Sequence, residues 1–207
     1  GCGTGLLWTL RENRARIPAT WHLTLSDFSF GMVETTRATG IAANLLQSDA
    51  QAIPFHDGYF DVVIANHMLY HVPDVLRAIA EIRRVLKPSG TFYAATNGLG
   101  HMREYFQWVS EFLGMEPVAP STHFTLENGA AQLDKHFARV QRVDYEDSLR
   151  VTQVEPLFAF IMSGFMGKQM IGAERASALR QFIADRIVRD GAFRITKSTG
   201  LFIASGA

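Results

Sequence analysis

Apolar residues recur along this chain with the period of strands and of helices in turn. Residues 60–66, Phe-Asp-Val-Val-Ile-Ala-Asn, form a nearly continuous apolar run, which is typical of a strand buried on both faces. Apolar and polar residues alternate over 21–25, which predicts a strand that leads to Asp27. Shorter strands are predicted over 45–47 and 91–96.

The clearest helix is predicted over residues 73–87. Leu76, Ile79 and Ile82 recur at helical spacing, while charged residues take the opposite side. Pro88-Ser89-Gly90 should close this helix. Two further helices are predicted in the first half of the chain, over 5–16 and 28–39.

Strands and helices alternate through the first half of the chain, and this order predicts an α/β fold with a doubly wound, mostly parallel sheet. The second half is less regular. Its pattern predicts helices over 101–114 and 125–137, a strand-rich stretch over 137–151, two helices within 153–190 that break near 164–172, and a last strand over 194–205.

The chain opens on a glycine-rich loop, Gly1-Cys2-Gly3-Thr4-Gly5, and Asp27 follows the next predicted strand. Glycines let the backbone turn sharply and approach a ligand closely. A carboxylate at the end of the following strand can accept hydrogen bonds from ribose hydroxyls. Dinucleotide-binding folds place their third glycine one residue later, so the alternating spacing suits a nucleoside ligand without a pyrophosphate.

Four blocks of the sequence, in this order, resemble the class I S-adenosylmethionine-dependent methyltransferases of the small-molecule type. They are the glycine loop, Ser48-Asp49-Ala50, the run 60–66 and Val85-Leu86-Lys87-Pro88-Ser89-Gly90. The resemblance is strong over residues 1–97. It implies a Rossmann-like sheet of seven strands that ends in an antiparallel pair. It also implies one domain over 1–207, with a cofactor-binding half (1–97) and an acceptor-pocket half (98–207) that carries a helical insertion at 153–190.

One feature departs from this family. In the family a hydrophobic strand leads into the glycine loop, whereas this sequence begins at the loop itself. A parallel sheet without its central strand would leave backbone N–H and C=O groups of the neighbouring strands without partners. We therefore expect residues upstream of Gly1. The family's acid that binds the methionine amino group therefore has no counterpart to assign.

The resemblance also implies which residues bind S-adenosylmethionine. The loop glycines should meet its methionine end, and Asp27 should bind its ribose hydroxyls. The Asp49 side chain and the Ala50 amide should contact the adenine, while Phe28 either lies against the adenine or packs in the core. The expected cofactor-binding residues are Gly1, Gly3, Gly5, Asp27, Phe28, Asp49, Ala50, Asn66 and His67.

Polar residues after the predicted strands 60–66 and 91–96 are candidates for the acceptor pocket, because open α/β sheets bind ligands at the carboxyl ends of their strands. These residues are Tyr70, His71, Asn97, His101 and Tyr105. His67 and His71 are the candidate general bases, although either could simply pack or line the pocket. We predict no metal site, because the sequence has no cysteine pair or His-Glu-x-x-His motif.

The composition narrows the possible partners. Twenty basic and twenty acidic residues give zero formal charge, which argues against nucleic acid as a partner. The single cysteine, Cys2, excludes an intrachain disulfide. No apolar run is long enough to span a membrane. We therefore expect a cytoplasmic enzyme, either a monomer or a homodimer.

Together these features predict transfer of a methyl group from S-adenosylmethionine to a small-molecule acceptor that the sequence does not name. Two alternatives stay open. An NAD-dependent oxidoreductase would use the same topology and a ribose-binding acid, although the glycine spacing and the Asp49 block count against it. A catalytically silent nucleoside-binding module would keep the cofactor pocket without turnover.

Overall fold

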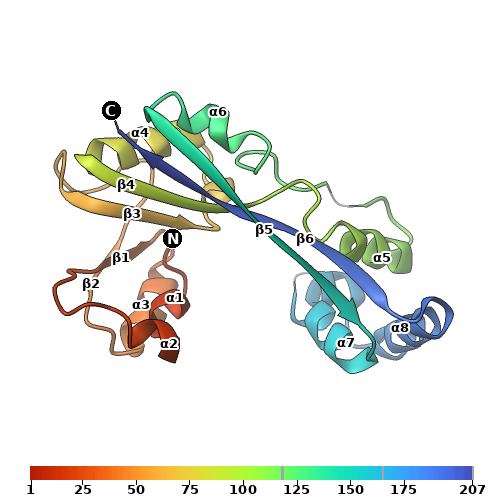
Figure 1. The fold of residues 1–207 in the computed structure, drawn as a ribbon. Coiled ribbons are helices and arrows are strands. Elements are labelled where there is room, and N and C mark those ends of the chain that lie inside the picture. The colour runs from red at the N-terminus through yellow and green to blue at the C-terminus, as the bar shows by residue number, and fades with distance from the viewer. Residues whose placement is uncertain (118, 165, 207) are drawn as a thin grey trace. The chain divides into compact units, whose positions relative to one another are not determined.

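The computed structural model describes residues 1–117, 119–164 and 166–206, which form two compact units (Figure 1). Unit 1 comprises residues 1–96, 122–143 and 200–207, and unit 2 comprises residues 97–121 and 144–199. This division differs from the two predicted halves, because two later segments of the chain return to unit 1.

Six strands are present in the described residues, in two sheets. A parallel pair joins β1 to β2, with Leu25 opposite Leu45. The other sheet has the order β3-β4-β6-β5, and β3 and β4 are parallel with Val63 opposite Phe92. The strands are β1 (Thr24–Asp27), β2 (Asn44–Gln47), β3 (Phe60–Asn66), β4 (Leu86–Asn97), β5 (Arg139–Val151) and β6 (Phe193–Ser205).

The single continuous sheet that the sequence suggested is therefore interrupted. Within the described residues β1 pairs with β2 and β3 pairs with β4, but no ladder joins β1 to β3. The prediction that the strand over 60–66 is buried on both faces is wrong for the described residues, because Val62 is 48% and Ile64 43% exposed. The strand expected to lead into the glycine loop stays a prediction.

The helix α4 (Val75–Val85) confirms the clearest helical prediction. Asp74 caps it by accepting a hydrogen bond from the Arg77 amide at 2.9 Å, as an N-cap carboxylate does. Its buried face, including Ile79 and Ile82, packs against β3 and β4 in the core of unit 1. No loop follows, because β4 begins at Leu86 and the Pro-Ser-Gly segment belongs to the strand, contrary to prediction.

The prediction of a single helix over 5–16 is wrong, because the helix is divided in two. Two short helices stand there, α1 (Leu6–Thr9) and α2 (Arg11–Arg14). Leu10 separates them with an extended backbone, φ −53° and ψ 132°, which ends one helix and begins the next. The following helix α3 (Phe30–Ala38) begins as predicted near Phe28, with the Ser29 hydroxyl accepting from the Met32 amide.

Unit 2 has its own apolar core, made chiefly by helices. The prediction of two helices broken near 164–172 is confirmed, since a π-helical segment, η2, stands between α7 and α8. The helices of unit 2 are α5 (Arg103–Leu113), α7 (Val154–Ser163), η2 (Met166–Ile171) and α8 (Ala176–Asp190).

Two short helices complete unit 1, namely η1 (Leu69–His71) and α6 (Gly129–Leu133). The second is shorter than the predicted helix over 125–137. Hydrogen bonding holds a turn before it, because the Asn128 side chain accepts from the Thr125 amide at 2.8 Å. None of the described helices is both long and apolar enough to cross a membrane.

Candidate functional site

The glycine loop lies along the carboxyl end of β1. The Cys2 amide donates to the Ser26 carbonyl at 2.7 Å, and the Gly5 amide donates back to the Cys2 carbonyl at 3.0 Å. Gly3 and Gly5 have positive φ angles of 56° and 74°. Only glycine adopts this region without a steric cost, so the backbone favours glycine at both positions.

The Asp27 carboxylate lies directly against this loop. One of its oxygens accepts from the Gly3 amide at 2.8 Å, and the other accepts from the Ser29 amide at 3.0 Å. A carboxylate offers about four acceptor sites. Two main-chain donors thus fix the orientation of the group and leave about half of its acceptor capacity for a ligand.

The three loop glycines differ in what surrounds them. A Cβ on Gly1 would lie 2.7 Å from the Met68 Cβ, and one on Gly5 would lie 2.8 Å from the Thr36 Cγ2. A Cβ on Gly3 would meet no atom of the protein within 4 Å. Packing therefore requires glycine at positions 1 and 5, while Gly3 borders open space in which a ligand could approach the backbone.

The end of β2 adjoins the end of β1 and carries Asp49. The Ser48 amide donates to the Asp27 carbonyl at 3.0 Å, which brings the two strand ends together. The Asp49 carboxylate accepts from the Gln51 amide at 2.8 Å and from the Gln51 side chain at 3.1 Å. Ala50 packs against the core of unit 1. Contact of these residues with an adenine stays a prediction.

Phe28 follows Asp27 with its side chain 73% exposed. The Phe28 side chain is therefore not packed among the described residues, and its contact with an adenine stays a prediction. An exposed aromatic ring beside the Asp27 carboxylate can stack on a flat aromatic ligand.

His67 and two other aromatic residues of the predicted site follow β3. The His67 amide donates to the Ala95 carbonyl at 3.0 Å, and its φ of 52° is unusual for a residue other than glycine. The His67 and Tyr70 rings are 6.5 Å apart, and the Tyr70 and His71 rings are 4.5 Å apart. A residue held in this sparsely populated region often belongs to a functional site.

Desolvation sets the protonation states of His67 and Tyr70. Partial burial lowers the pKa of His67 below 6.5 and raises the pKa of Tyr70 above 10.0. Near pH 7 the imidazole is therefore neutral and can accept a proton, while the phenol keeps its proton. Asn66 is exposed at the end of β3 beside them.

We expect a pH titration of the protein, followed by NMR of the His67 ring, to give a midpoint below 6.5. As the pH falls through 6.5, the unfolded chain takes up this proton before the folded chain does, so His67 contributes stability above that pH and loses it below. The variant His67→Asn assigns the resonance, because asparagine tolerates a positive φ. A midpoint at or above 6.5 would contradict this account.

The remaining predicted acceptor residues lie in unit 2. Asn97 ends β4, and the His101 Nδ1 accepts from the Ser198 amide at 3.2 Å, which leaves the proton of a neutral ring on Nε2. Tyr105 is 8% exposed, and its burial raises the pKa of the phenol. Their role with an acceptor stays a prediction.

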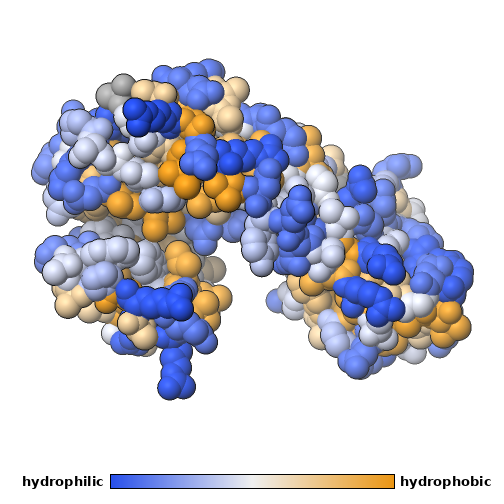
Figure 2. All heavy atoms as spheres, in the orientation of Figure 1, coloured by the Kyte–Doolittle hydropathy of each residue, from blue (hydrophilic) through white to orange (hydrophobic). Residues whose placement is uncertain are grey.

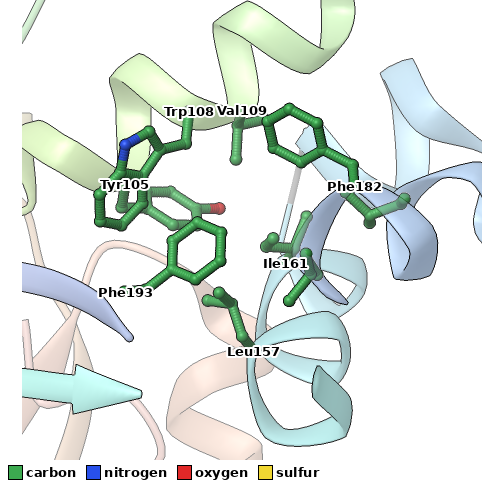
Figure 3. Close-up of a pocket in the computed structure, with 9 residues that line it drawn as sticks. Tyr105, Trp108, Val109, Leu157, Ile161, Phe182 and Phe193 are labelled. Atoms are coloured by element: carbon green, nitrogen blue, oxygen red, sulfur yellow. The ribbon is translucent and has the colours of Figure 1, made fainter. Parts of the chain in front are cut away.

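Tyr105 contributes to an apolar cavity within unit 2 (Figure 3). The side chains of α5, α7 and α8 converge there, and the space between them is about 10 Å³. An apolar gap of this size is at the limit for a single water. In this conformation Tyr105 therefore has a packing role. The lining residues are Tyr105, Trp108, Val109, Leu157, Ile161, Leu179, Phe182, Ile183 and Phe193.

A larger hollow of about 290 Å³ lies in unit 1 beside α1 and α2. Figure 2 shows hydrophobic residues on the surface in the region where Figure 1 has these helices. None of the predicted cofactor or acceptor residues lines this hollow. Its lining residues are Leu7, Trp8, Asn13, Arg16, Ile17, Trp21 and Ile64.

The structure adds residues that the sequence reasoning missed. Thr36 is fully buried beside the glycine loop, Ser29 donates to Asp27, and Gln51 holds Asp49. One signal could have pointed to Thr36, since it lies three residues after Val33 and therefore on the same face of a predicted helix. The contacts of Ser29 and Gln51 both have the spacing of an Asx turn, in which an aspartate accepts from the amide two residues later, so Asp27 and Asp49 could have pointed to them.

Comparisons with known proteins relate the first half of the chain to methyltransferases. Residues 1–94 match the family model described as a methyltransferase domain. Over 92 residues the chain is 40% identical to a demethylmenaquinone methyltransferase of Staphylococcus aureus (strain MRSA252). That match covers 43% of this chain and only 37% of the relative's length.

Solved structures extend the likeness to the whole chain. A putative methyltransferase from Bacillus halodurans C-125 has a TM-score of 0.65 at 16% identity, covering 100% of this chain and 90% of that one. Geranyl diphosphate methyltransferase, solved in complex with SAM, has a TM-score of 0.55 at 14% identity, covering 100% and 76%. At these identities the likeness concerns the fold alone. The predicted Rossmann-like α/β fold is thereby confirmed, although its strands form two sheets within the described residues.

Proposed function

We propose that this protein, whose residues 1–94 match a family model described as a methyltransferase domain, transfers a methyl group from S-adenosylmethionine to a small-molecule acceptor. The cofactor binds in unit 1, over the glycine loop and beside Asp27. Asp49, Ala50 and Phe28 receive its adenine, and Asn66 and His67 lie beside its sulfonium.

The observation that carries this proposal is the arrangement around Gly3. Its amide fixes the Asp27 carboxylate at 2.8 Å, and open space lies where its Cβ would be. The carboxylate keeps about two acceptor sites after binding two amides, and a ribose has two neighbouring hydroxyls to donate. The loop and the acid thus fit a nucleoside without any change in the described backbone.

The chemistry is divided between the cofactor and the chain. S-adenosylmethionine supplies, when bound, a methyl carbon made electrophilic by its sulfonium. The chain has to orient the donor and the acceptor, and this alone can lower a barrier substantially. His67 is neutral near pH 7 and can accept a proton from a hydroxyl acceptor, whereas an amine or thiolate acceptor needs little help. His71, which contacts Tyr70, is the second candidate base.

Calorimetric titration separates this proposal from its main alternative. We expect S-adenosylhomocysteine to bind the purified protein and NAD to give no heat. Binding of NAD without binding of S-adenosylhomocysteine would favour the oxidoreductase. With methyl-labelled S-adenosylmethionine and a panel of small hydroxyl, amine and thiol compounds, mass spectrometry should then detect one labelled product. A protein that binds the cofactor but labels no compound would be a silent binding module instead.

A further inference from the structure

Thr36 on α3 uses its side chain differently from the neighbouring threonine. The exposed Thr35 hydroxyl donates to the Gly31 carbonyl of its own helix at 2.9 Å, which is the usual local bond of a helical threonine. Thr36 is 0% exposed, and its hydroxyl donates instead to the Gly3 carbonyl at 2.9 Å. A helix is thereby tied to a loop that lies 33 residues earlier in the chain.

This bond completes a set of restraints on Gly3. The Gly3 amide donates to Asp27, and its carbonyl accepts from Thr36, so both polar groups of the peptide backbone at this residue are held. The methyl group of Thr36 lies beside Gly5, so that a Cβ added at Gly5 would be only 2.8 Å from it. One buried side chain therefore touches two of the three loop glycines.

We propose that Thr36 is a positioning residue for the cofactor site. Its hydroxyl holds Gly3 in the left-handed conformation that aims the Gly3 amide at Asp27, and Asp27 in turn presents its free acceptor sites to the ribose. Thr36 itself touches no substrate and acts through Gly3. This inference rests on the proposed function, since it assigns the restraint to binding of S-adenosylmethionine.

A set of variants separates the hydroxyl from the packing of the side chain. Thr36→Val keeps the shape and removes the hydroxyl, whereas Thr36→Ser keeps the hydroxyl and removes the methyl. Thr36→Ala is a second variant without the hydroxyl, for use if valine does not fold. The matched control is Thr96→Val, because Thr96 is also 0% exposed in unit 1 and donates to a carbonyl, that of Phe124, at 2.8 Å.

The measurements are the affinity for S-adenosylhomocysteine, the thermal midpoint, and hydrogen exchange at residues 3–5 without ligand. We expect Thr36→Val to lower the affinity about three- to ten-fold and to speed exchange in the loop. Thr36→Ser should stay close to the parent, and Thr96→Val should lose stability without losing affinity. Unchanged affinity and exchange in a folded hydroxyl-free variant, or equal losses in the valine and serine variants, would overturn the proposal.

The two hypotheses fail in different ways. If the parent protein does not bind S-adenosylhomocysteine, the proposed function fails and the positioning role falls with it. If the parent binds but the affinity does not follow the Thr36 hydroxyl, only the positioning role is wrong.

Discussion

Replacing Asp27 with asparagine is expected to lower the affinity for S-adenosylhomocysteine by at least about ten-fold while the protein stays folded. The two carboxylate oxygens accept from the Gly3 and Ser29 amides. An asparagine has only one oxygen, so its own NH₂ group would face one of these N–H donors. The side chain would then rotate or lose a partner, and the ribose would lose a charged acceptor, which contributes about 1.5–3 kcal/mol.

Calorimetry measures this effect, and Asp134→Asn serves as its control. Asp134 is an exposed carboxylate of unit 1 that lies just after α6. Its replacement removes the same charge without touching the loop, so its affinity should match that of the parent. Equal affinities for Asp27→Asn, Asp134→Asn and the parent would remove Asp27 from the site.

The second large effect is expected for Gly3→Ala. Its φ of 56° imposes a penalty of about 1 kcal/mol on any residue with a Cβ, and no protein atom lies within 4 Å of the new methyl. The variant should therefore fold with a thermal midpoint lowered by about 2–4 °C. The methyl would project into the space assigned to the ligand, so affinity for S-adenosylhomocysteine should fall by about ten-fold or more.

Gly40→Ala is a close match for this variant. Gly40 has a φ of 65°, and a Cβ there also meets nothing within 4 Å. It follows α3, away from the glycine loop, and should show the same loss of thermal midpoint with normal affinity. If both alanine variants bind like the parent, the open space beside Gly3 is not where the ligand lies.

The parts of the fold that could be predicted are those in which one local pattern decides the structure. The helical period of α4 buries a whole face, as predicted, and the apolar run 60–66 forms the strand β3, although only Ala65 of that run is buried. The break between α1 and α2 at Leu10 could not be predicted, because leucine is a good helix former and its extended backbone carries no local signal. The Pro-Ser-Gly segment was misleading for the opposite reason. It is typical of a loop, yet the pairing of Phe60 with Leu86 begins β4 before it.

In the candidate site, too, only the features that a local sequence pattern decides could be predicted. The proximity of the glycine loop to Asp27 could be predicted from the residue types and their spacing, whereas their contact with a cofactor stays a prediction. The exposure of Phe28 and the burial of Tyr105 could not be predicted, because neither property is encoded in the residue type. Thr36 depends on a contact between segments far apart in the chain, and only the fold brings them together.

A crystal structure of the protein with S-adenosylhomocysteine tests the central claim most directly. The account predicts that both ribose hydroxyls donate to the Asp27 carboxylate, and that the amino-acid end of the ligand passes over Gly3 with no protein atom displaced. The adenine should lie near Phe28 and Asp49. A ligand bound elsewhere, for example in the hollow beside α1 and α2, with Asp27 contacting only its two amides, would contradict the account.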